Sequence, residues 1–459
     1  MVSIHKEYVN RSIKIKCLKR MENLMLQNRS TINSFRYIFL LYISVILCFS
    51  FFYLLKPAHN GHLSYIDALF VSTSALSVTG LSTLDVATEF TRVGQILLIL
   101  EMQLGGVGIL VLISYLFLVM GKRISMSSLI LISKDQNQSN LKTIKSLSFS
   151  VLIIALSIEA ICFFLIYGEI RKGYNSSSEA AFVAAFHSVA SFTNSGFTLF
   201  GFNAYKTNKL VLYTTACVIF LGSLGFPTIM ETLLSFRKKK SLFTKINIRM
   251  HLILFGVGAL LIFLLESNKE FSPLKLADKI ANSIFLSATL RSGGMTTVDL
   301  SSLAETTVLI FMCLMFIGGA SSSTGGGIRL TTFRVLIAKM ISVVKSQEHT
   351  VIDKKTITQE TVNKSFLIFL SFTALVVVST ILIVFIDTYS LEKVLFEVVS
   401  ALTNTGLSLG ITSQLSGISK VILMCLMVIG RIGIFTLIYF VFRVENSKLK
   451  YLREDLAVG

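Results

Sequence analysis

Four short glycine phrases recur along this chain at wide spacing. They read SVTGLS, TNSGFT, RSGGMT and TNTGLS, and their central glycines are Gly80, Gly196, Gly294 and Gly406. These glycines lie 116, 98 and 112 residues apart, and each phrase follows a short apolar stretch and precedes a long one. A second glycine phrase begins 25, 26, 24 and 24 residues later, at Gly105, Gly222, Gly318 and Gly430. Spacing this regular predicts a fourfold internal repeat.

The composition predicts an integral membrane protein. Hydrophobic residues make up 53% of the 459 residues, only 15% are charged, and the mean hydropathy is +0.73. Soluble proteins carry about a quarter charged residues. The apolar run at residues 35–55 is long enough to cross a bilayer, which takes roughly 20 residues. It is too long for a signal peptide, and no small-residue cleavage site follows it.

The positive charge is distributed unevenly between the connectors. The net charge is +18, and the bases gather in residues 1–34 and in three connectors at residues 123–145, 237–249 and 334–364. The other connectors carry fewer bases, mixed with the carboxylates Asp85, Glu89, Glu169, Glu266, Glu270, Asp299 and Glu305. This positive-inside pattern predicts a multi-pass membrane protein with both termini cytoplasmic, and it argues against nucleic acid as the partner of the basic charge. Residues 1–20 are expected to form a helix that lies on anionic lipid headgroups.

Each repeat follows the same plan of spanning helix, half-helix, glycine loop and spanning helix. The expected spans are residues 35–55, 93–120, 147–167, 210–236, 251–265, 306–344, 365–386 and 418–442. Between them lie short apolar runs at residues 64–77, 178–192, 276–290 and 391–403, which suit re-entrant half-helices. We therefore predict an all-α membrane protein with eight transmembrane helices and four half-helices around a central pore. Its segments are a cytoplasmic N-terminal segment (1–34), pore repeats at 35–122, 146–237, 250–345 and 364–443, and a cytoplasmic tail (444–459).

The half-helices begin with carboxylates. These are Asp67, Glu179, Asp278 and Glu392, and Asp67 follows Ser64 in capping-box spacing. Negative charge suits the N-terminal end of a helix dipole. We favour helix capping as their role and keep direct ion binding as the alternative.

The glycine phrases are the candidate selectivity filter. A non-helical segment at membrane depth is tolerated only where it lines a cavity or is buried, and glycine lets consecutive carbonyls point the same way. Rings of such carbonyls can replace the hydration shell of a cation. Close helix packing is the alternative role for a glycine here. The candidate filter residues are Val78, Thr79, Gly80, Asn194, Ser195, Gly196, Ser292, Gly293, Gly294, Asn404, Thr405 and Gly406.

The third phrase differs from the others because it carries Arg291 where they have serine or threonine. A charge in the permeation path would repel cations. We therefore expect the Arg291 side chain to point away from the axis and to pair with a nearby carboxylate, while its carbonyl can still contribute.

A candidate gate lies in the second glycine phrase of repeat three. This phrase, GGASSSTGGG, would break a spanning helix. An intramembrane arginine, Arg431, occupies the matching place in repeat four and is functional by default. We expect Arg431 to hold the loop closed, with a structural pair to Glu101 or Glu231 as the alternative. The candidate gate residues are Gly318, Gly319, Ser321, Ser322, Ser323, Thr324, Gly325, Gly326, Gly327 and Arg431.

These features resemble the Trk/Ktr/HKT potassium transporter superfamily, and the size resembles the membrane subunit of a bacterial Ktr potassium uptake system. The resemblance covers about residues 35–445. It implies potassium uptake, with sodium dependence in some members, by a homodimer docked on a cytosolic RCK-type ring that binds nucleotide. This chain itself carries no dinucleotide or phosphate-loop motif, so it is expected to bind no nucleotide. Many members carry alanine where this chain has Gly293.

Other function classes are disfavoured by the pattern. A sodium- or proton-coupled secondary transporter of another small solute would use inverted repeats, whereas these repeats share one orientation. Glu101, Glu159 and Glu231 could relay protons in such a transporter, but we favour helix pairing as their role. The histidines and cysteines show neither convincing metal-ligand spacing nor a nucleophile–base set, so an enzyme is not expected.

Overall fold

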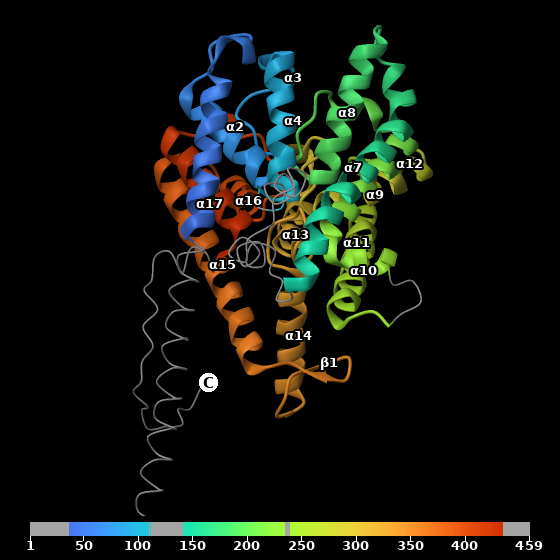
Figure 1. Ribbon diagram of the computed structural model, residues 1–459, viewed down its shortest axis with the longest axis vertical. Coiled ribbons are helices and arrows are strands. Elements are labelled where there is room, and N and C mark those ends of the chain that lie inside the picture. The colour runs from blue at the N-terminus through green and yellow to red at the C-terminus, as the bar shows by residue number, and fades with distance from the viewer. Residues whose placement is uncertain (1–35, 110, 112–140, 235–238, 435–459) are drawn as a thin grey trace, which may run out of the picture.

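The computed structural model describes residues 36–109, 111, 141–234 and 239–434, and these residues are mostly helical (Figure 1). The expected N-terminal lipid-binding helix, the C-terminal tail and most of the first basic connector lie outside the described residues.

The first helix of each repeat is long and apolar. These helices are Arg36–Tyr53, α7 (Leu141–Arg171), α11 (Leu242–Glu266) and α15 (Gln359–Ile386). Side-chain caps start two of them, Ser241 for α11 and Thr358 for α15. Large apolar side chains point outward, with Phe164 77% and Phe385 89% exposed. Among the described residues, these four helices alone are continuous, long and apolar enough to cross a bilayer, and their exposed apolar faces suit lipid.

The expected half-helices are present in all four repeats. They are α2 (Tyr65–Ser77), α8 (Ser177–Thr193), α12 (Leu276–Thr289) and α16 (Leu391–Leu402). With 12 to 17 residues each, they are shorter than the roughly 20 residues that a crossing takes. Ser64 caps α2, because its hydroxyl accepts from Asp67 N–H at 3.1 Å and also donates to the Asp67 carboxylate at 2.6 Å.

The second helix of each repeat is interrupted. These helices are α4 (Arg92–Val107), α9 (Lys209–Leu224), α13 (Glu305–Phe316) and α17 (Gly417–Ile432). Three end at glycines with positive φ, namely Gly108 (98°), Gly225 (90°) and Gly433 (93°). After Gly225 the chain turns by 100° into α10 (Phe226–Leu234). A break was predicted only in repeat three, so the uninterrupted spans expected over residues 93–120, 210–236 and 418–442 differ from the structure.

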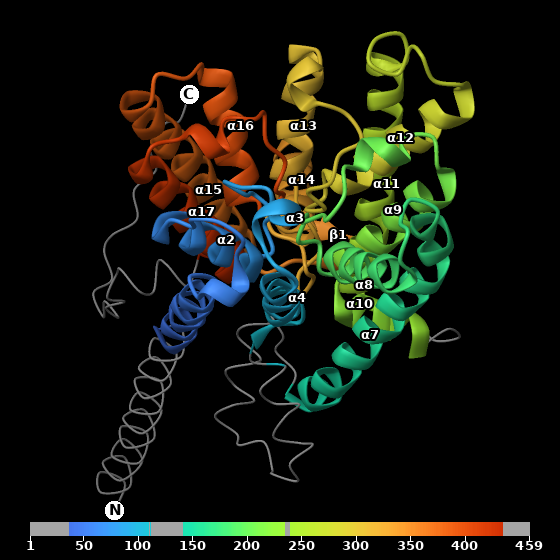
Figure 2. The same ribbon diagram turned by 90° about the horizontal axis from the view of Figure 1, so that it is seen from above.

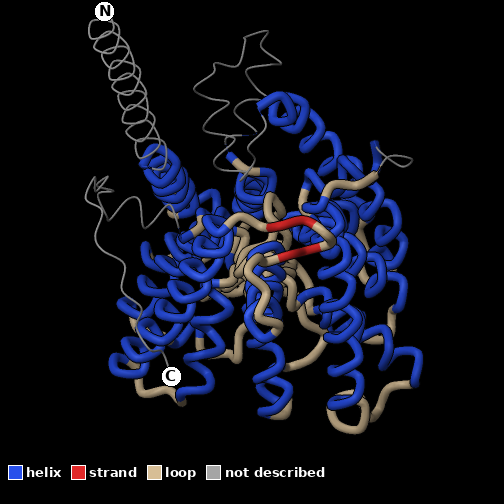
Figure 3. Tube along the Cα trace, turned by 90° about the horizontal axis from the view of Figure 1, so that it is seen from below, coloured by secondary structure: helices blue, strands red, loops and turns tan. Residues whose placement is uncertain are grey.

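The repeats close into a ring. The half-helix of each repeat packs against the second helix of the repeat before it: α2 on α17, α8 on α4, α12 on α9 and α16 on α13. Seen from above, the four repeats follow one another around a centre (Figure 2). Loop segments gather at that centre, surrounded by helices (Figure 3). This is the predicted architecture of four helix–half-helix–helix repeats around one axis.

Repeats three and four are joined below the ring. α14 (Leu330–Val344) leads into a hairpin of β1 (Val351–Ile352) and β2 (Lys355–Thr356), which is followed by α15. The hairpin lies at the lower end of the described chain (Figure 1). Its two turn residues, Asp353 and Lys354, have φ of 47° and 62°, as a type I′ turn requires.

Short elements complete the described chain. They are α3 (Val86–Glu89) and the 3₁₀ turns η1 (Lys56–Ala58), η2 (Phe202–Tyr205), η3 (Leu300–Ser302) and η4 (Thr412–Gln414).

Candidate functional site

The four glycine loops share one backbone conformation. Each central glycine has a positive φ: Gly80 93°, Gly196 75°, Gly294 66° and Gly406 87°. The residue two positions earlier is also left-handed, at Val78, Asn194, Ser292 and Asn404. In all four repeats, the N–H just before the glycine returns to the half-helix, for example Thr79 N–H to Ser74 O at 2.8 Å and Gly293 N–H to Thr289 O at 2.6 Å. These N–H groups are therefore occupied inside the protein.

The carbonyls that precede the glycines meet around the axis. A Cβ placed on Gly80 would lie 2.4 Å from Ser195 O, and one on Gly406 would lie 2.0 Å from Thr79 O. A Cβ on Gly294 would lie 2.7 Å from Thr405 O, and one on Gly196 would lie 3.4 Å from Gly293 O. Each glycine thus faces the carbonyl of the next repeat, and the glycine of repeat four faces the carbonyl of repeat one. The four contacts therefore form a closed ring.

These four oxygens are free of protein donors. The carbonyls of Thr79, Ser195, Gly293 and Thr405 accept no hydrogen bond from any residue in the described part of the chain. Four unpaired carbonyls gathered on an axis provide a ring of ligands for a dehydrated cation.

Side chains brace the ring from behind. Asn404 Nδ2 donates to Thr79 Oγ1 at 2.9 Å and to Met427 O at 2.8 Å, which ties repeat four to repeat one and to α17. Thr403 and Thr405 share a hydrogen bond of 2.8 Å between their hydroxyls, and Ser77 and Thr79 share one of 2.7 Å. These contacts limit how far the carbonyls can move.

The second glycine phrase serves close packing. A Cβ on Gly105 would lie 2.2 Å from Leu76 O, one on Gly222 would lie 2.3 Å from Phe192 O, and one on Gly430 would lie 2.1 Å from Leu402 O. In each case the carbonyl stands four residues before the central glycine of the same repeat. The packing role that was the alternative for the first glycines therefore describes these second glycines.

The repeat-three loop, residues 317–329, lies buried against α9. Ala320 N–H donates to Ser223 O at 2.9 Å, and Phe226 N–H donates to Ser322 O at 3.0 Å. Gly326 N–H donates to the Ser292 hydroxyl at 3.0 Å, which connects the loop to the third glycine phrase. The loop therefore lies directly beside α9 and the third glycine phrase.

Three arginines hold this loop by its carbonyl oxygens. Arg291 donates to Gly318 O at 2.7 Å, Arg329 donates to Gly325 O, and Arg431 donates to Thr324 O. Arg431 also donates to Gly105 O of repeat one. The loop is thus held between repeats one, three and four.

Two expectations about these arginines need correction. Arg291, only 2% exposed, bonds a carbonyl and no carboxylate among the described residues, so its predicted ion pair is wrong. The alternative pair of Arg431 with Glu101 or Glu231 is also absent from the described chain, because it contacts loop and α4 carbonyls instead. Backbone carbonyls carry no signal in a sequence, so these partners could not be read from it.

The carboxylates of the membrane region serve the helices. Glu101 accepts from Tyr53 at 2.7 Å and from Ser72 at 2.5 Å, and Glu159 accepts from Gln103 at 2.5 Å. At the half-helix starts, Asp67 pairs with Lys420 at 3.0 Å and Asp278 pairs with Lys209 at 3.5 Å. Both pairs join a half-helix to the second helix of the preceding repeat, which fits helix pairing. No side-chain cap starts α8, α12 or α16, so the structure shows no capping by Glu179, Asp278 or Glu392.

Two candidate functional residues were not predicted from the sequence. Arg329 follows the last glycine of the loop by two residues, and this position was the available signal. Glu397, in α16 and 1% exposed, accepts from Ser408 at 2.5 Å, Thr412 at 2.8 Å and Leu409 N–H at 3.2 Å. It fixes the segment after the fourth glycine loop, and nothing distinguished it from other helix carboxylates in the sequence.

The chain resembles known transporters over most of its length. The family model TrkH, described as a cation transport protein, matches residues 4–450. The Ktr system potassium uptake protein D of Bacillus subtilis is 36% identical over 86% of this chain and 90% of its own length. The Ktr system potassium uptake protein B of Vibrio alginolyticus is 34% identical over 92% of this chain and 94% of its own.

A solved structure shares the fold. The crystal structure of the potassium transporter TrkH from Vibrio parahaemolyticus superposes with a TM-score of 0.72 at 20% identity, over 90% of this chain and 85% of that chain. The sequence prediction of a transport protein rather than an enzyme is therefore confirmed. The chain belongs to the TrkH family of cation transport proteins.

Proposed function

We propose that this protein takes up potassium across the bacterial cytoplasmic membrane through a pore on the axis of its four repeats. The observation that carries the proposal is the closed ring of unpaired carbonyls from Thr79, Ser195, Gly293 and Thr405. Carbonyl oxygens replace the hydration shell of a cation without adding charge. The named potassium uptake function of the relatives at 34–36% identity supports the same substrate.

The filter is short, with one central glycine per repeat. Fewer coordinating rings give weaker discrimination between potassium and sodium. A relative from Enterococcus hirae, 30% identical, is named a potassium/sodium uptake protein. We therefore propose potassium as the preferred ion, with sodium as a second ion that this filter can admit.

The repeat-three loop is the proposed gate. It is buried beside the glycine loops and held there by the guanidinium groups of Arg291, Arg329 and Arg431. No carboxylate of the described chain pairs with these three groups, so their positive charge also opposes cation passage while the loop is in place. Opening then consists of moving the loop away from Arg431 and Gly105.

The names of the relatives support a proposal about the wider assembly. Their names place them in Ktr systems, and we propose that this chain forms a homodimer on a cytosolic, nucleotide-binding RCK-type ring. Both termini and the basic connectors then face that ring in the cytoplasm. The chain itself supplies the pore and no nucleotide site.

Rubidium uptake by a bacterium that lacks its own potassium uptake systems tests the function. The chain is expressed with and without an RCK-type ring protein, and uptake is measured against external sodium. We expect uptake that the ring protein increases and that sodium reduces only at higher concentration. Uptake no greater than that of the empty host, with the protein present in the membrane, would overturn the proposal.

A further inference from the structure

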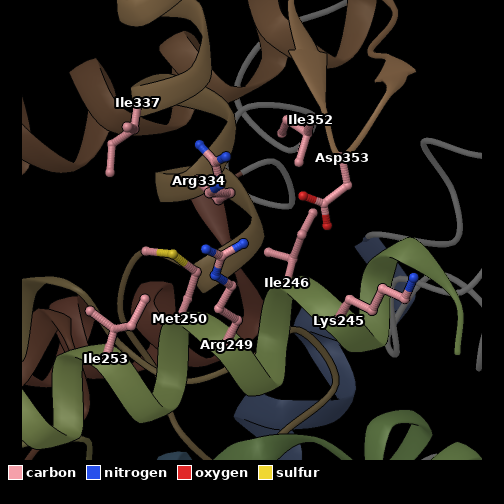
Figure 4. A pocket seen from close by; sticks show the side chains of 9 residues that line it. All are labelled: Lys245, Ile246, Arg249, Met250, Ile253, Arg334, Ile337, Ile352 and Asp353. Carbon is pink, nitrogen blue, oxygen red and sulfur yellow. The ribbon is translucent and has the colours of Figure 1, made fainter.

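A pocket of about 200 Å³ lies below the repeat-three loop, between α11, α14 and the hairpin (Figure 4). Three bases, Lys245 and Arg249 of α11 and Arg334 of α14, line it together with one carboxylate, Asp353. Its remaining lining is apolar: Ile246, Met250, Ile253, Ile337 and Ile352. The pocket thus combines a basic part with an apolar part.

The charged groups of this pocket are not used by the fold. Within the described ranges, none of the four makes an ion pair within 4.0 Å or a hydrogen bond. Other bases of the chain find carboxylates, as Lys206 does at 2.9 Å from Glu270. In Figure 4 the Arg249 side chain points from α11 toward Arg334, and Asp353 lies across the pocket from these two arginines. Three bases against one carboxylate leave the pocket with a net positive charge and free donors.

The apolar part continues onto the outer surface of α11. Ile253, one turn beyond Arg249, is 48% exposed, and Leu252 and Val257 are 54% and 45% exposed. These residues belong to the long apolar helix that is suited to contact lipid. A ligand with a phosphate head and an acyl chain matches this sequence of basic and apolar surface. Basic pockets between membrane helices bind phospholipid headgroups in this way.

We propose that this pocket binds the phosphate of an anionic phospholipid, with the phosphate between Arg249 and Arg334 and an acyl chain along Ile253. The guanidinium fork bonds phosphate oxygens in pairs, which a compact ammonium cannot do. Asp353 weakens the attraction and so sets the affinity below that of an all-basic pocket.

The bound phosphate also acts on the loop above it. Ile246, Met250 and Ile352 of the pocket belong to one apolar cluster with Ala320 of the loop and with Leu330, the first residue of α14. A phosphate that bridges Arg249 and Arg334 fixes α14 relative to α11, and so holds the loop in the position described. This regulatory step rests on the proposed gate, whereas lipid binding does not.

Lipid binding to the full chain, purified in detergent, is measured by native mass spectrometry with added phosphatidylglycerol or phosphatidylcholine. The test variant is Arg249→Gln with Arg334→Gln. The matched control is Lys345→Gln with Lys355→Gln, which removes the same charge from exposed bases outside the pocket. Each base contributes a factor of about five to anionic-lipid binding, so we expect about 30-fold weaker phosphatidylglycerol binding in the test variant alone.

A second variant guards against misfolding. Asp353→Asn removes the opposing carboxylate from an exposed turn and should strengthen phosphatidylglycerol binding by about fivefold, by the same charge relation. Phosphatidylcholine binding should change in none of the variants.

Four results would overturn the proposal. The first is equal binding of phosphatidylglycerol by the test and control variants, and the second is no gain in Asp353→Asn. The third is displacement of the lipid by soluble glycerophosphoglycerol at equal concentration, which would assign the site to a soluble phosphate. The fourth is displacement by an acidic peptide of the ring protein, which would assign it to that partner. Loss of rubidium uptake in every chain, including the unaltered one, would refute the transport function and leave the binding result standing.

Discussion

Substitution of Gly80 by serine tests the geometry of the carbonyl ring. A Cβ at this position would lie 2.4 Å from Ser195 O, whereas real Cβ contacts are essentially never closer than 3.0 Å. One of the two must therefore shift by at least about 0.6 Å, and the Cβ and the Ser195 carbonyl are both fixed to backbone that has little room to move. The perturbation acts on one ligand of the ring and leaves the other three repeats chemically unaltered.

The expected magnitude follows from the value of one carbonyl contact. A hydrogen-bond-like contact to a charged group contributes about 1.5–3 kcal/mol. Removing one such contact from potassium reduces its preference over sodium by about tenfold or more, since each 1.4 kcal/mol is a factor of ten. Rubidium uptake in competition with sodium measures this preference directly.

Gly410→Ser is the matched control. Gly410 has φ of 88°, close to the 93° of Gly80, but a Cβ there meets nothing within 4 Å. Both variants share the cost of a left-handed side chain, about 1–2 kcal/mol, and only Gly80→Ser crowds the ring. Unchanged sodium competition in Gly80→Ser, or an equal change in both variants, would show that crowding of the carbonyl ring does not lower the preference for potassium.

Three further outcomes follow from the same contacts. Gly105→Ala should lower the thermal midpoint by an amount corresponding to about 1–3 kcal/mol because its Cβ has no room, whereas Gly168→Ala, with open space around it, should leave it equal or higher; equal midpoints would contradict the packing role. Arg431→Gln should raise rubidium flux by about tenfold or more, because each lost bond from a charged donor contributes about 1.5–3 kcal/mol to holding the loop closed. Unchanged flux would contradict the role of Arg431 in the gate. Glu397→Gln should destabilise the protein by about 1.5–3 kcal/mol in thermal unfolding. Glu392→Gln, at a half-buried carboxylate that accepts no hydrogen bond from the described residues, should change stability by less than about 0.5 kcal/mol; similar losses would contradict the bracing role of Glu397.

The repeat architecture could be predicted because its signal is periodic. Gly80 and its three counterparts recur at similar intervals, and each one needs the positive φ that the structure gives it. The half-helices were equally visible, because short apolar runs flanked by polar segments have few other solutions in a bilayer. Period and composition therefore sufficed for the arrangement of helices around the axis.

The interruptions of the second helices could have been predicted but were not. Gly108, Gly225 and Gly433 stand in the second glycine phrases or directly after them, and one is followed two residues later by Pro227. Each phrase contains several glycines, and the sequence does not say which one packs and which one ends the helix. Only the close approach of Gly105 to Leu76 O, set beside the positive φ of Gly108, separates these two roles.

The carbonyl partners of the arginines could not be predicted. Arg291 was expected to pair with a carboxylate, and Arg431 was expected to hold the repeat-three loop, with a carboxylate pair as the alternative, because an opposite charge is the partner that a sequence displays. In the structure their partners are the carbonyls of Gly318 and Thr324, which become available only because the loop is not helical. Whether a backbone oxygen is free depends on the fold around it, and local sequence does not carry that information.

An anomalous-scattering map of crystals grown with rubidium tests whether the carbonyl ring binds the ion. We expect a rubidium peak on the axis, bounded by the carbonyl oxygens of Thr79, Ser195, Gly293 and Thr405, and we expect this peak to be weaker in Gly80→Ser. A map with no peak at this ring, and with rubidium bound instead at carboxylates such as Asp67 or Glu392, would contradict this expectation.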